Sequence, residues 1–435
     1  MTAGGLTLIQ FAAYAADGGP MAPPPVPVPA ATAASESAAA VPEASAPAAH
    51  LPWATAMDDF IATALAEDPS IERARSNIAA AEEGVTAAKW QFGPTPSLSR
   101  EPSSSGYVNV LRIQQPLYTG GALEAGLRSA RMVVQGSQEE LASAQMQLRI
   151  RLVTNWADWV KSRQHVASLQ TLANQHEELL AMIQRRTDAG VGTVSDAALA
   201  TSRLSAVQAE LAQARLEEAL QRHQLQRLAR RPVEPPLAQA LDGTLPDAPE
   251  LATILDHIQT SPDMAIARAS VDIAREDLNK AKASLLPTIS LRMERQTGAV
   301  RDQSIGLVMQ ASFGGGLASF SSVNAARHRI LAAEAAVSAT EQDLFNRYQL
   351  EYTRYASACA SARSAVATAE ASDVVLASYR RQFAAGKRAW LDLLNMVRES
   401  HSARQSQHDA AIEQRASLYR LNVLLQATGT ELQAH

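Results

Sequence analysis

The sequence predicts a mainly helical fold with a small β part, built from two similar halves. One observation is a stretch at 317–385 without glycine or proline, matched by 122–189, which holds only two glycines. Another is a segment at 289–313 in which apolar and polar residues alternate, as they do in a strand. The third is a repeat, because Pro94-Thr95-Pro96-Ser97-Leu98 returns 193 residues later as Pro287-Thr288-Ile289-Ser290-Leu291.

The repeat and the composition divide the chain into five segments. We expect a Pro- and Ala-rich leader at 1–52, a first structural repeat at 53–231, a Pro-rich linker at 232–249, a second repeat at 250–429 and a tail at 430–435. An apolar run at 6–16 ends in a small-x-small pattern without a basic flank, and we interpret it as a truncated export signal. No apolar run reaches the roughly 18 residues of a transmembrane helix.

Each half is expected to begin with a helix of moderate length. These helices span 54–90 and 251–286, and each ends shortly before a proline, Pro94 or Pro287, that begins extended chain. The residues between helix and proline therefore mark a change from helix to strand.

After Pro287 the side chains alternate with the period of a strand. Ile289, Leu291 and Met293 are apolar, and the residues between them are polar. With the alternation that resumes after 298, this predicts two strands of about nine to eleven residues, the length of a tilted membrane-spanning strand. If the apolar set faces lipid, Arg292 and Glu294 face a watery lumen, because a charge on the lipid face costs about 2 to 4 kcal/mol at the midplane.

The first half contains a weaker copy of these strands, at 97–102 and 107–115, with Pro102 at a strand end. Four strands cannot close a barrel, and an open edge leaves unpaired backbone groups in hydrocarbon. Several copies of the chain must therefore share one barrel. Aromatic residues flank the strands, either as an interfacial belt or as ordinary packing: Trp90, Phe92, Tyr107, Tyr118, Phe313 and Phe320.

The glycine-poor stretches predict two helices on the order of 100 Å long. Each is expected to turn at a glycine, Gly190 or Gly386, and to return as a helix at 193–231 or 387–428. Small and apolar residues recur at three- and four-residue spacing along them, which favours coiled-coil pairing with close approach of the helices.

Composition and motifs weigh against several classes of function. A net charge of −5 gives no basic surface for nucleic acid. The only cysteine, Cys359, leaves no intrachain disulfide, and the nine histidines are scattered. His401 and His408 lie seven residues apart without a third ligand, and the glycine-rich turns lack the Lys-Ser/Thr ending of a phosphate loop. We expect neither catalysis nor a cofactor or metal.

The two hairpin tips are the strongest candidate site. The segments Ala189 to Asp196 and Ala385 to Asp392 each place an acid just inside the returning helix. An acid there complements the helix dipole, an effect of about 0.3 to 1 kcal/mol, and this ordinary role remains open. Alternatively, copies of both acids converge around an axis and line or close a pore.

The duplicated layout and the tip motif AG-x-x-x-x-x-D, which occurs twice, resemble the TolC-like outer-membrane efflux family from about 54 to 429. The resemblance implies a homotrimer in which each protomer adds four strands to one transmembrane β-barrel and its helices to an α-barrel that projects into the periplasm. Such ducts, located in the outer membrane, dock on a periplasmic adaptor and on an inner-membrane transporter of the ABC or proton-driven type. They pass protein or small toxic compounds without chemistry.

The resemblance also assigns roles to tip residues. The family's constricting acidic ring maps onto Asp392, and its second acidic position, three residues on, is Asn395 here. Asp196 is the other tip acid expected at the pore constriction. The bonds that close the gate map onto Ser195 and Asp196 of one hairpin and Phe383 and Arg388 of the other, where Phe383 replaces the usual tyrosine. Residues expected to face the adaptor are Gly190, Val191, Gly192, Gly386 and Lys387.

The sequence thus predicts a passive outer-membrane exit duct for type I secretion or efflux, gated at the periplasmic tip. The alternative is a soluble periplasmic coiled-coil scaffold or adaptor, which would leave the apolar stripe at 305–313 in water. An enzyme would need a group of ligands or a nucleophile that the sequence does not offer.

Overall fold

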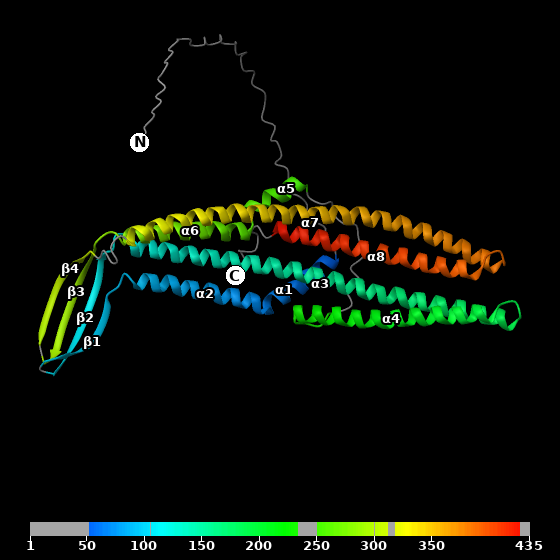
Figure 1. Cartoon of the computed structure of the whole chain (residues 1–435), viewed down its shortest axis with the longest axis horizontal. Coiled ribbons are helices and arrows are strands. Elements are labelled where there is room, and N and C mark those ends of the chain that lie inside the picture. Colours follow the sequence, from blue (N-terminus) through cyan, green and yellow to red (C-terminus); the bar gives the residue numbers. More distant parts are fainter. Residues whose placement is uncertain (1–51, 105, 234–249, 300, 312–317, 427–435) are drawn as a thin grey trace, which may run out of the picture. The chain divides into compact units, whose positions relative to one another are not determined.

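The computed structural model describes residues 52–104, 106–233, 250–299, 301–311 and 318–426. The predicted leader apart from Pro52, most of the predicted linker, the tail, Phe313 and Gly314-Gly315-Gly316 lie outside the described residues. Each half runs in the same order, which is helix, two strands, a very long helix and a returning helix (Figure 1). The mainly helical fold with a four-stranded sheet is confirmed.

The first helix of each half is divided, which corrects the prediction of one continuous helix at 54–90 and at 251–286. In the first half α1 (Pro52–Glu67) ends before α2 (Pro69–Trp90). In the second half α5 (Leu251–Asp256) and a short 3-10 helix η2 (His257–Thr260) precede α6 (Pro262–Ala283). A proline starts α2 and α6 because it lacks an N–H and disfavours helical geometry in the residue before it.

Capping residues complete these breaks. Asp68 has extended backbone and accepts a hydrogen bond from the Ser70 amide at 2.8 Å. Ser261 does the same for the Met264 amide at 3.3 Å. Each cap supplies an acceptor for an N–H group that the first turn of a helix leaves unpaired.

The four strands form one antiparallel sheet in the order β1-β2-β3-β4. They are β1 (Thr95–Ser103), β2 (Gly106–Tyr118), β3 (Thr288–Gly298) and β4 (Asp302–Gln310). The two halves meet where β2 pairs with β3, with Ile113 opposite Met293. Pro102 lies one residue from the end of β1, on an edge strand where its missing N–H is tolerated.

The long helices begin and end within one residue of the two glycine-poor stretches. They are α3 (Ala122–Asp188) and α7 (Ala318–Ala384), each of 67 residues. The returning helices are α4 (Val194–Ala229), which packs along α3, and α8 (Trp390–Gln426), which packs along α7 and also contacts α3. None of the described helices combines the length and apolar character needed to cross a membrane.

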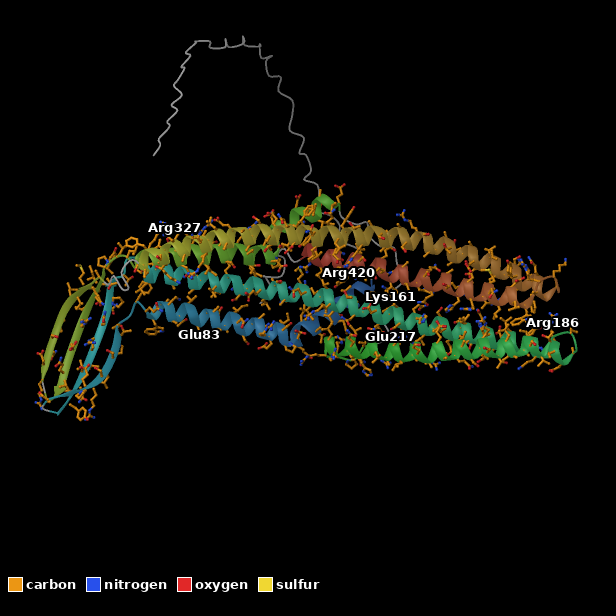
Figure 2. All side chains as sticks on the ribbon, in the orientation of Figure 1. Glu83, Lys161, Arg186, Glu217, Arg327 and Arg420 are labelled. Carbon is orange, nitrogen blue, oxygen red and sulfur yellow. The ribbon has the colours of Figure 1, made fainter. Side chains whose placement is uncertain are left out.

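Three groups of buried side chains hold the helices together. One surrounds Trp156 and Trp159 of α3 and joins it to α1, α4 and α8. A second joins α3, α4, α7 and α8 towards the tips and includes Phe383 and Leu393. A third surrounds Tyr348 of α7 and joins it to α5, α6 and α8. Charged side chains cover the outside of these helices (Figure 2).

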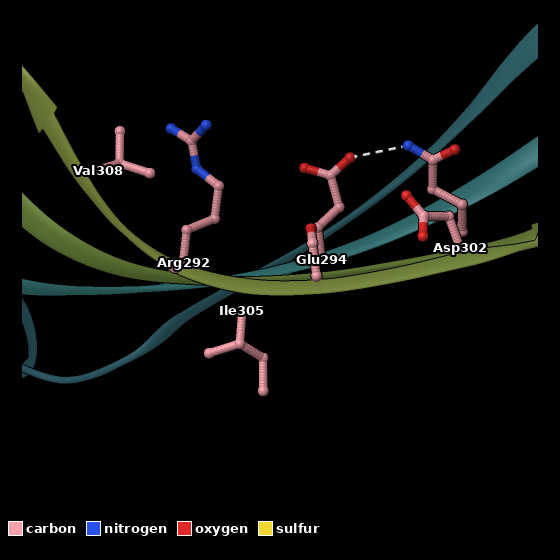
Figure 3. Close-up of a pocket in the computed structure, with 8 residues that line it drawn as sticks. Arg292, Glu294, Asp302, Ile305 and Val308 are labelled. Carbon is pink, nitrogen blue, oxygen red and sulfur yellow. Dashed lines mark hydrogen bonds between the residues drawn. The ribbon is translucent and has the colours of Figure 1, made fainter.

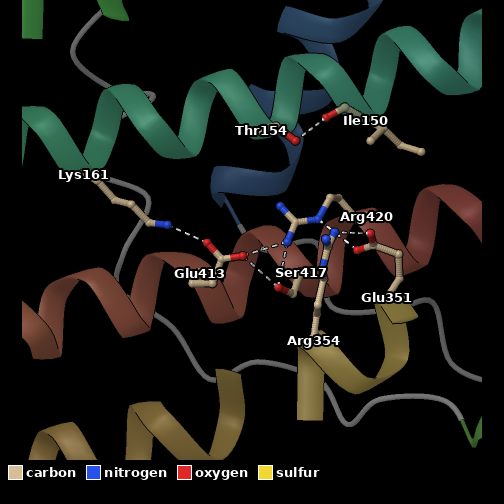
Figure 4. A network of polar contacts seen from close by, with 8 residues as sticks. All are labelled: Ile150, Thr154, Lys161, Glu351, Arg354, Glu413, Ser417 and Arg420. Atoms are coloured by element: carbon tan, nitrogen blue, oxygen red, sulfur yellow. Dashed lines mark hydrogen bonds and ion pairs between the residues drawn. The ribbon is translucent and has the colours of Figure 1, made fainter. Parts of the chain in front are cut away.

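A network of ion pairs crosses the contact of α3, α7 and α8 (Figure 4). The Lys161 ammonium lies 2.5 Å from a Glu413 carboxylate oxygen, and the Arg420 guanidinium lies 2.8 Å from the other. Arg420 also donates to Glu351 at 3.2 Å, and Arg354 donates to the same carboxylate at 2.7 Å. Burial raises the pKa of Glu413, but the hydrogen bonds and charges of Lys161 and Arg420 outweigh burial and lower the pKa to about 2.

Candidate functional site

The sheet has two faces of opposite character. The register places a set of apolar residues on one face, which we name the apolar face: Leu98, Leu111, Ile113, Ile289, Leu291, Met293, Ile305, Leu307 and Met309. Several are strongly exposed, with Leu98 at 76% and Leu307 at 70%. Contiguous exposed apolar surface of this kind marks a site of contact with lipid or protein.

The opposite face, which we name the polar face, contains the two residues expected to face a lumen. Arg292 and Glu294 project from this face, whereas Ile305 projects from the other side of the sheet (Figure 3). The Arg112 guanidinium lies 2.9 Å from the Glu294 carboxylate, and the Gln296 amide donates to that carboxylate at 3.0 Å. Gln114 donates to Ser290 at 3.0 Å one row further along. This side suits contact with water.

Both hairpin tips turn with the same backbone geometry. Gly190 and Gly386 have φ of 75° and 71°, a left-handed conformation that glycine adopts without strain. The amide after each glycine bonds back to the long helix, with Val191 donating to the Arg186 carbonyl at 2.9 Å and Lys387 to the Gln382 carbonyl at 2.9 Å. These bonds satisfy carbonyls that the end of a helix leaves open.

The first tip is closed by a capping box. The Asp196 amide donates to the Thr193 hydroxyl at 3.1 Å, and the Asp196 carboxylate accepts from the Thr193 amide at 3.3 Å. The other carboxylate oxygen accepts from the Trp390 indole N–H at 2.9 Å. Hydrogen bonds from Thr193 and Trp390 lower the pKa of Asp196. The ordinary capping role weighed for this acid is therefore present in the structure.

The second tip holds its acid differently. Ala389 occupies the position of Thr193, and it has no hydroxyl with which to cap α8. Asp392 instead lies 3.4 Å from the guanidinium of Arg388, four residues before it. That guanidinium also lies over the Tyr379 ring, 3.9 Å from its centroid, and donates to Gln382 at 3.3 Å.

Trp390 links the two tips within one protomer, since its indole N–H reaches Asp196 across 194 residues of sequence. Arg388, the residue expected to make a closing bond, faces Asp392 and Tyr379 of its own hairpin. Phe383 is buried at 5% exposure, with Arg186 of the first hairpin 5.5 Å from its ring centroid.

The remaining predicted tip residues lie at the surface. Val191 is 70% exposed, and Ser195, Lys387, Gly386 and Asn395 are also exposed. Gly190 is exposed and Gly192 is partly covered. These positions leave backbone and side chains available to a second protein. Their roles in docking and in a pore stay predictions.

Sequence reasoning missed the residues that hold the tips in place. These are Thr193, Trp390, Tyr379, Gln382 and Arg186. Thr193 had a readable signal, because a threonine three residues before an acid at a helix start is a capping box. Trp390 had none, because its partner lies in the other half of the chain.

No group of three potential metal ligands occurs among the described residues. His401 and His408, weighed earlier as metal ligands, lie on α8, and burial lowers the pKa of both. His408 lines a groove between α3, α7 and α8 together with glutamines and arginines. That lining offers no nucleophile and base pair.

Solved structures share this architecture. The outer membrane channel CmeC of Campylobacter jejuni superposes with a TM-score of 0.75 at 14% identity, covering 87% of this chain and 87% of that one. The fold is thus that of TolC-like channels, with a helical barrel and a β-barrel.

The chain belongs to the outer membrane efflux protein family, whose model matches residues 60–229 and 254–427, one stretch in each half. Its location is the outer membrane, with the helices in the periplasm. Two curated relatives are the alkaline protease secretion protein AprF of Pseudomonas aeruginosa, 24% identical over 68% of this chain, and the proteases secretion protein PrtF of Dickeya chrysanthemi, 22% identical over 69%. The matches span 65% of AprF and 68% of PrtF.

Proposed function

We propose that this protein is a passive exit duct that works as a homotrimer and exports protein. The observation that carries the proposal is the exposed apolar face of a sheet whose other face is polar and charged. An isolated four-stranded sheet has two open edges, so contact with lipid requires closure with the strands of sister chains. Protein as the cargo is favoured because both curated relatives are protease secretion proteins.

The exposed residues of the tips are proposed to bind a periplasmic adaptor. A duct without chemistry needs a transporter to supply energy and an adaptor to connect the two. The exposed tip residues, Val191 and Lys387 among them, are the surface we assign to the adaptor. The cargo test also decides the class of transporter. Export of protein would indicate an ABC transporter, and efflux of small compounds would leave the proton-driven type open.

The test begins with the purified chain. We expect it to fractionate with outer membranes, to require detergent, to migrate as a heat-sensitive trimer and to conduct ions in planar bilayers. A chain that remains monomeric and dissolves without detergent would favour the soluble scaffold and end the proposal. Cargo is tested by deleting the gene in its host and comparing secreted protein with drug susceptibility. Loss of one secreted protein with unchanged susceptibility is the expected result.

The gate is proposed to lie at the tips, where copies of Asp392, held by Arg388, surround the axis with Asn395 near them. The first hairpin meets the second where Trp390 donates to Asp196, beside Ser195, and where Arg186 lies over the ring of Phe383. In this arrangement Trp390 takes the place of the absent tyrosine hydroxyl, since its N–H supplies the bond to Asp196.

We predict that Arg388→Ser and Trp390→Phe each raise single-channel conductance in planar bilayers. The first frees Asp392 from its ion pair, and the second removes one bond between the hairpins while keeping an aromatic ring. Asp392→Ala should raise conductance and lower cation selectivity, because it removes an acid from the ring. Ser205→Ala, at an exposed position of α4 that has no assigned gate role, is the matched control. Unchanged conductance in all three variants would remove the gate assignment.

A further inference from the structure

The charged residues of the apolar face are all arginine and all lie at one end. Among the described strand residues, Arg100 and Arg295 are the only charged side chains that the register places on that face. Arg301 is exposed and directly precedes Asp302, which pairs with Gln296 on the polar face. Continuing the register by one residue places Arg301 opposite Thr297, on the apolar side. These arginines lie at the end of the sheet that carries the β1-β2 and β3-β4 turns, remote from the helices (Figure 1).

The polar face differs, because it carries both signs. Arg112 pairs with Glu294, and Asp302 and Glu101 lie on the same side. Charges facing a watery lumen compensate one another, whereas the strand register places no described acid beside the cations of the apolar face. Such a one-sided arrangement indicates that the compensating anion comes from outside the chain.

The three arginines are exposed, and none forms a salt bridge to another described residue. Arg100 is held against the Tyr107 ring, with its guanidinium 4.5 Å from the centroid, a contact that orients the charge at the edge of the apolar band. Tyrosine and arginine at such an edge are typical of the layer where hydrocarbon meets polar headgroups.

The register also sets the spacing. Arg100 and Arg295 are two strands and two residues apart, so their Cα atoms are separated by about 12 Å. Between them lie Asn109 and Thr297, which offer neutral hydrogen-bonding groups. A guanidinium binds phosphate through two parallel N–H groups, and several of them around such a gap suit a headgroup that carries more than one phosphate.

We propose that Arg100, Arg295 and Arg301 form a binding site for a phosphorylated lipid headgroup in the outer leaflet. The inference rests on the proposed function, because only a membrane-inserted sheet with its helices in the periplasm brings these turns to that leaflet. The site tethers lipid at the rim of the barrel, and it is separate from the polar face and from the tips.

The test uses the full-length protein in detergent, titrated with lipid A that carries both phosphates and observed by native mass spectrometry. Replacing all three arginines by glutamine should weaken binding roughly hundredfold, at about fivefold for each charge. Wild-type protein should bind the same lipid without phosphates as weakly as the variant binds the phosphorylated form. The variant in which all three become lysine should retain most of the affinity.

A matched control removes the same charge elsewhere, with Arg203→Gln, Arg215→Gln and Arg227→Gln on α4, and should bind as the wild type does. Equal binding by wild type and the sheet variant, or equal binding of both lipid forms, would overturn the site. If those proteins still form conducting trimers, the proposed duct stands and only the lipid site fails. A chain that forms no trimer overturns the duct and, with it, this inference.

Discussion

The two hairpin tips share one backbone and use their acids in opposite ways. Both turn on a left-handed glycine, and Asp196 and Asp392 stand at equivalent positions, 196 residues apart. The first acid closes a capping box and accepts from Trp390. The second has no cap to complete and pairs with Arg388 beside it. Duplication thus preserved the turn, while one copy kept its acid for local structure and the other holds its acid in a half-exposed ion pair.

The two tips also differ in the residue three positions before the glycine, and mutations can test this difference. Phe383 and Thr187 occupy equivalent places before the two glycines. Because Phe383 is buried in the core group near the tips, Phe383→Ala should lower the free energy of unfolding by about 3 to 5 kcal/mol. Thr187→Ala removes a hydroxyl that bonds the Ile183 carbonyl at 3.0 Å and should cost about 1 kcal/mol.

Denaturant unfolding in detergent measures both changes. Amide exchange at 379–396 localises the effect of Phe383→Ala, and amide exchange at 183–196 localises that of Thr187→Ala. Equal losses for the two variants would contradict the asymmetry of the tips. A loss confined to Thr187→Ala would reverse it.

A smaller effect should separate Glu413 from its equivalent, Glu217, labelled in Figure 2. Glu217 is exposed and accepts a hydrogen bond from the neutral amide of Gln221, whereas Glu413 binds Lys161 and Arg420. Glu413→Gln should therefore cost about 2 kcal/mol at neutral pH, and Glu217→Gln less than about 0.5 kcal/mol.

The contribution of Glu413 to the free energy of unfolding should also depend on pH. Because the pKa of Glu413 is about 2 in the folded chain and about 4.3 when unfolded, its stabilisation is complete above pH 4.3 or so and is lost as pH falls towards 2. Thermal unfolding of wild type and Glu413→Gln should converge over that range. Parallel curves that never approach one another would exclude the ion pairs as the cause.

The last comparison exchanges the two caps, and its expected effect is smaller than that of Glu413→Gln. Thr193→Ala should cost about 1 kcal/mol by removing the capping hydroxyl of α4. Ala389→Thr should stabilise α8 by a similar amount and draw Asp392 away from Arg388, with a measurable rise in conductance under the proposed gate. If neither variant changes the melting temperature, the capping box contributes nothing to this tip.

Much of this arrangement was predictable from sequence, for identifiable reasons. Glycine and proline interrupt helices, so their absence from α7 and their scarcity in α3 predicted the bounds of both helices. Alternation placed Arg292 and Glu294 on one face. The breaks at Pro69 and Pro262 were missed although the preceding Asp68 and Ser261 are common caps, because apolar spacing continues through both sites. Contacts between the halves, such as Trp390 with Asp196, leave no local pattern at all.

The equal length of α3 and α7, 67 residues each, constrains how such a chain can evolve. Removing one residue from either helix would shift its tip by about 1.5 Å and rotate it by roughly 100° relative to the other. Trp390 would then no longer face Asp196. The contact between the tips therefore requires α3 and α7 to keep the same length. A duct of different depth would arise only through insertions or deletions made in both copies together.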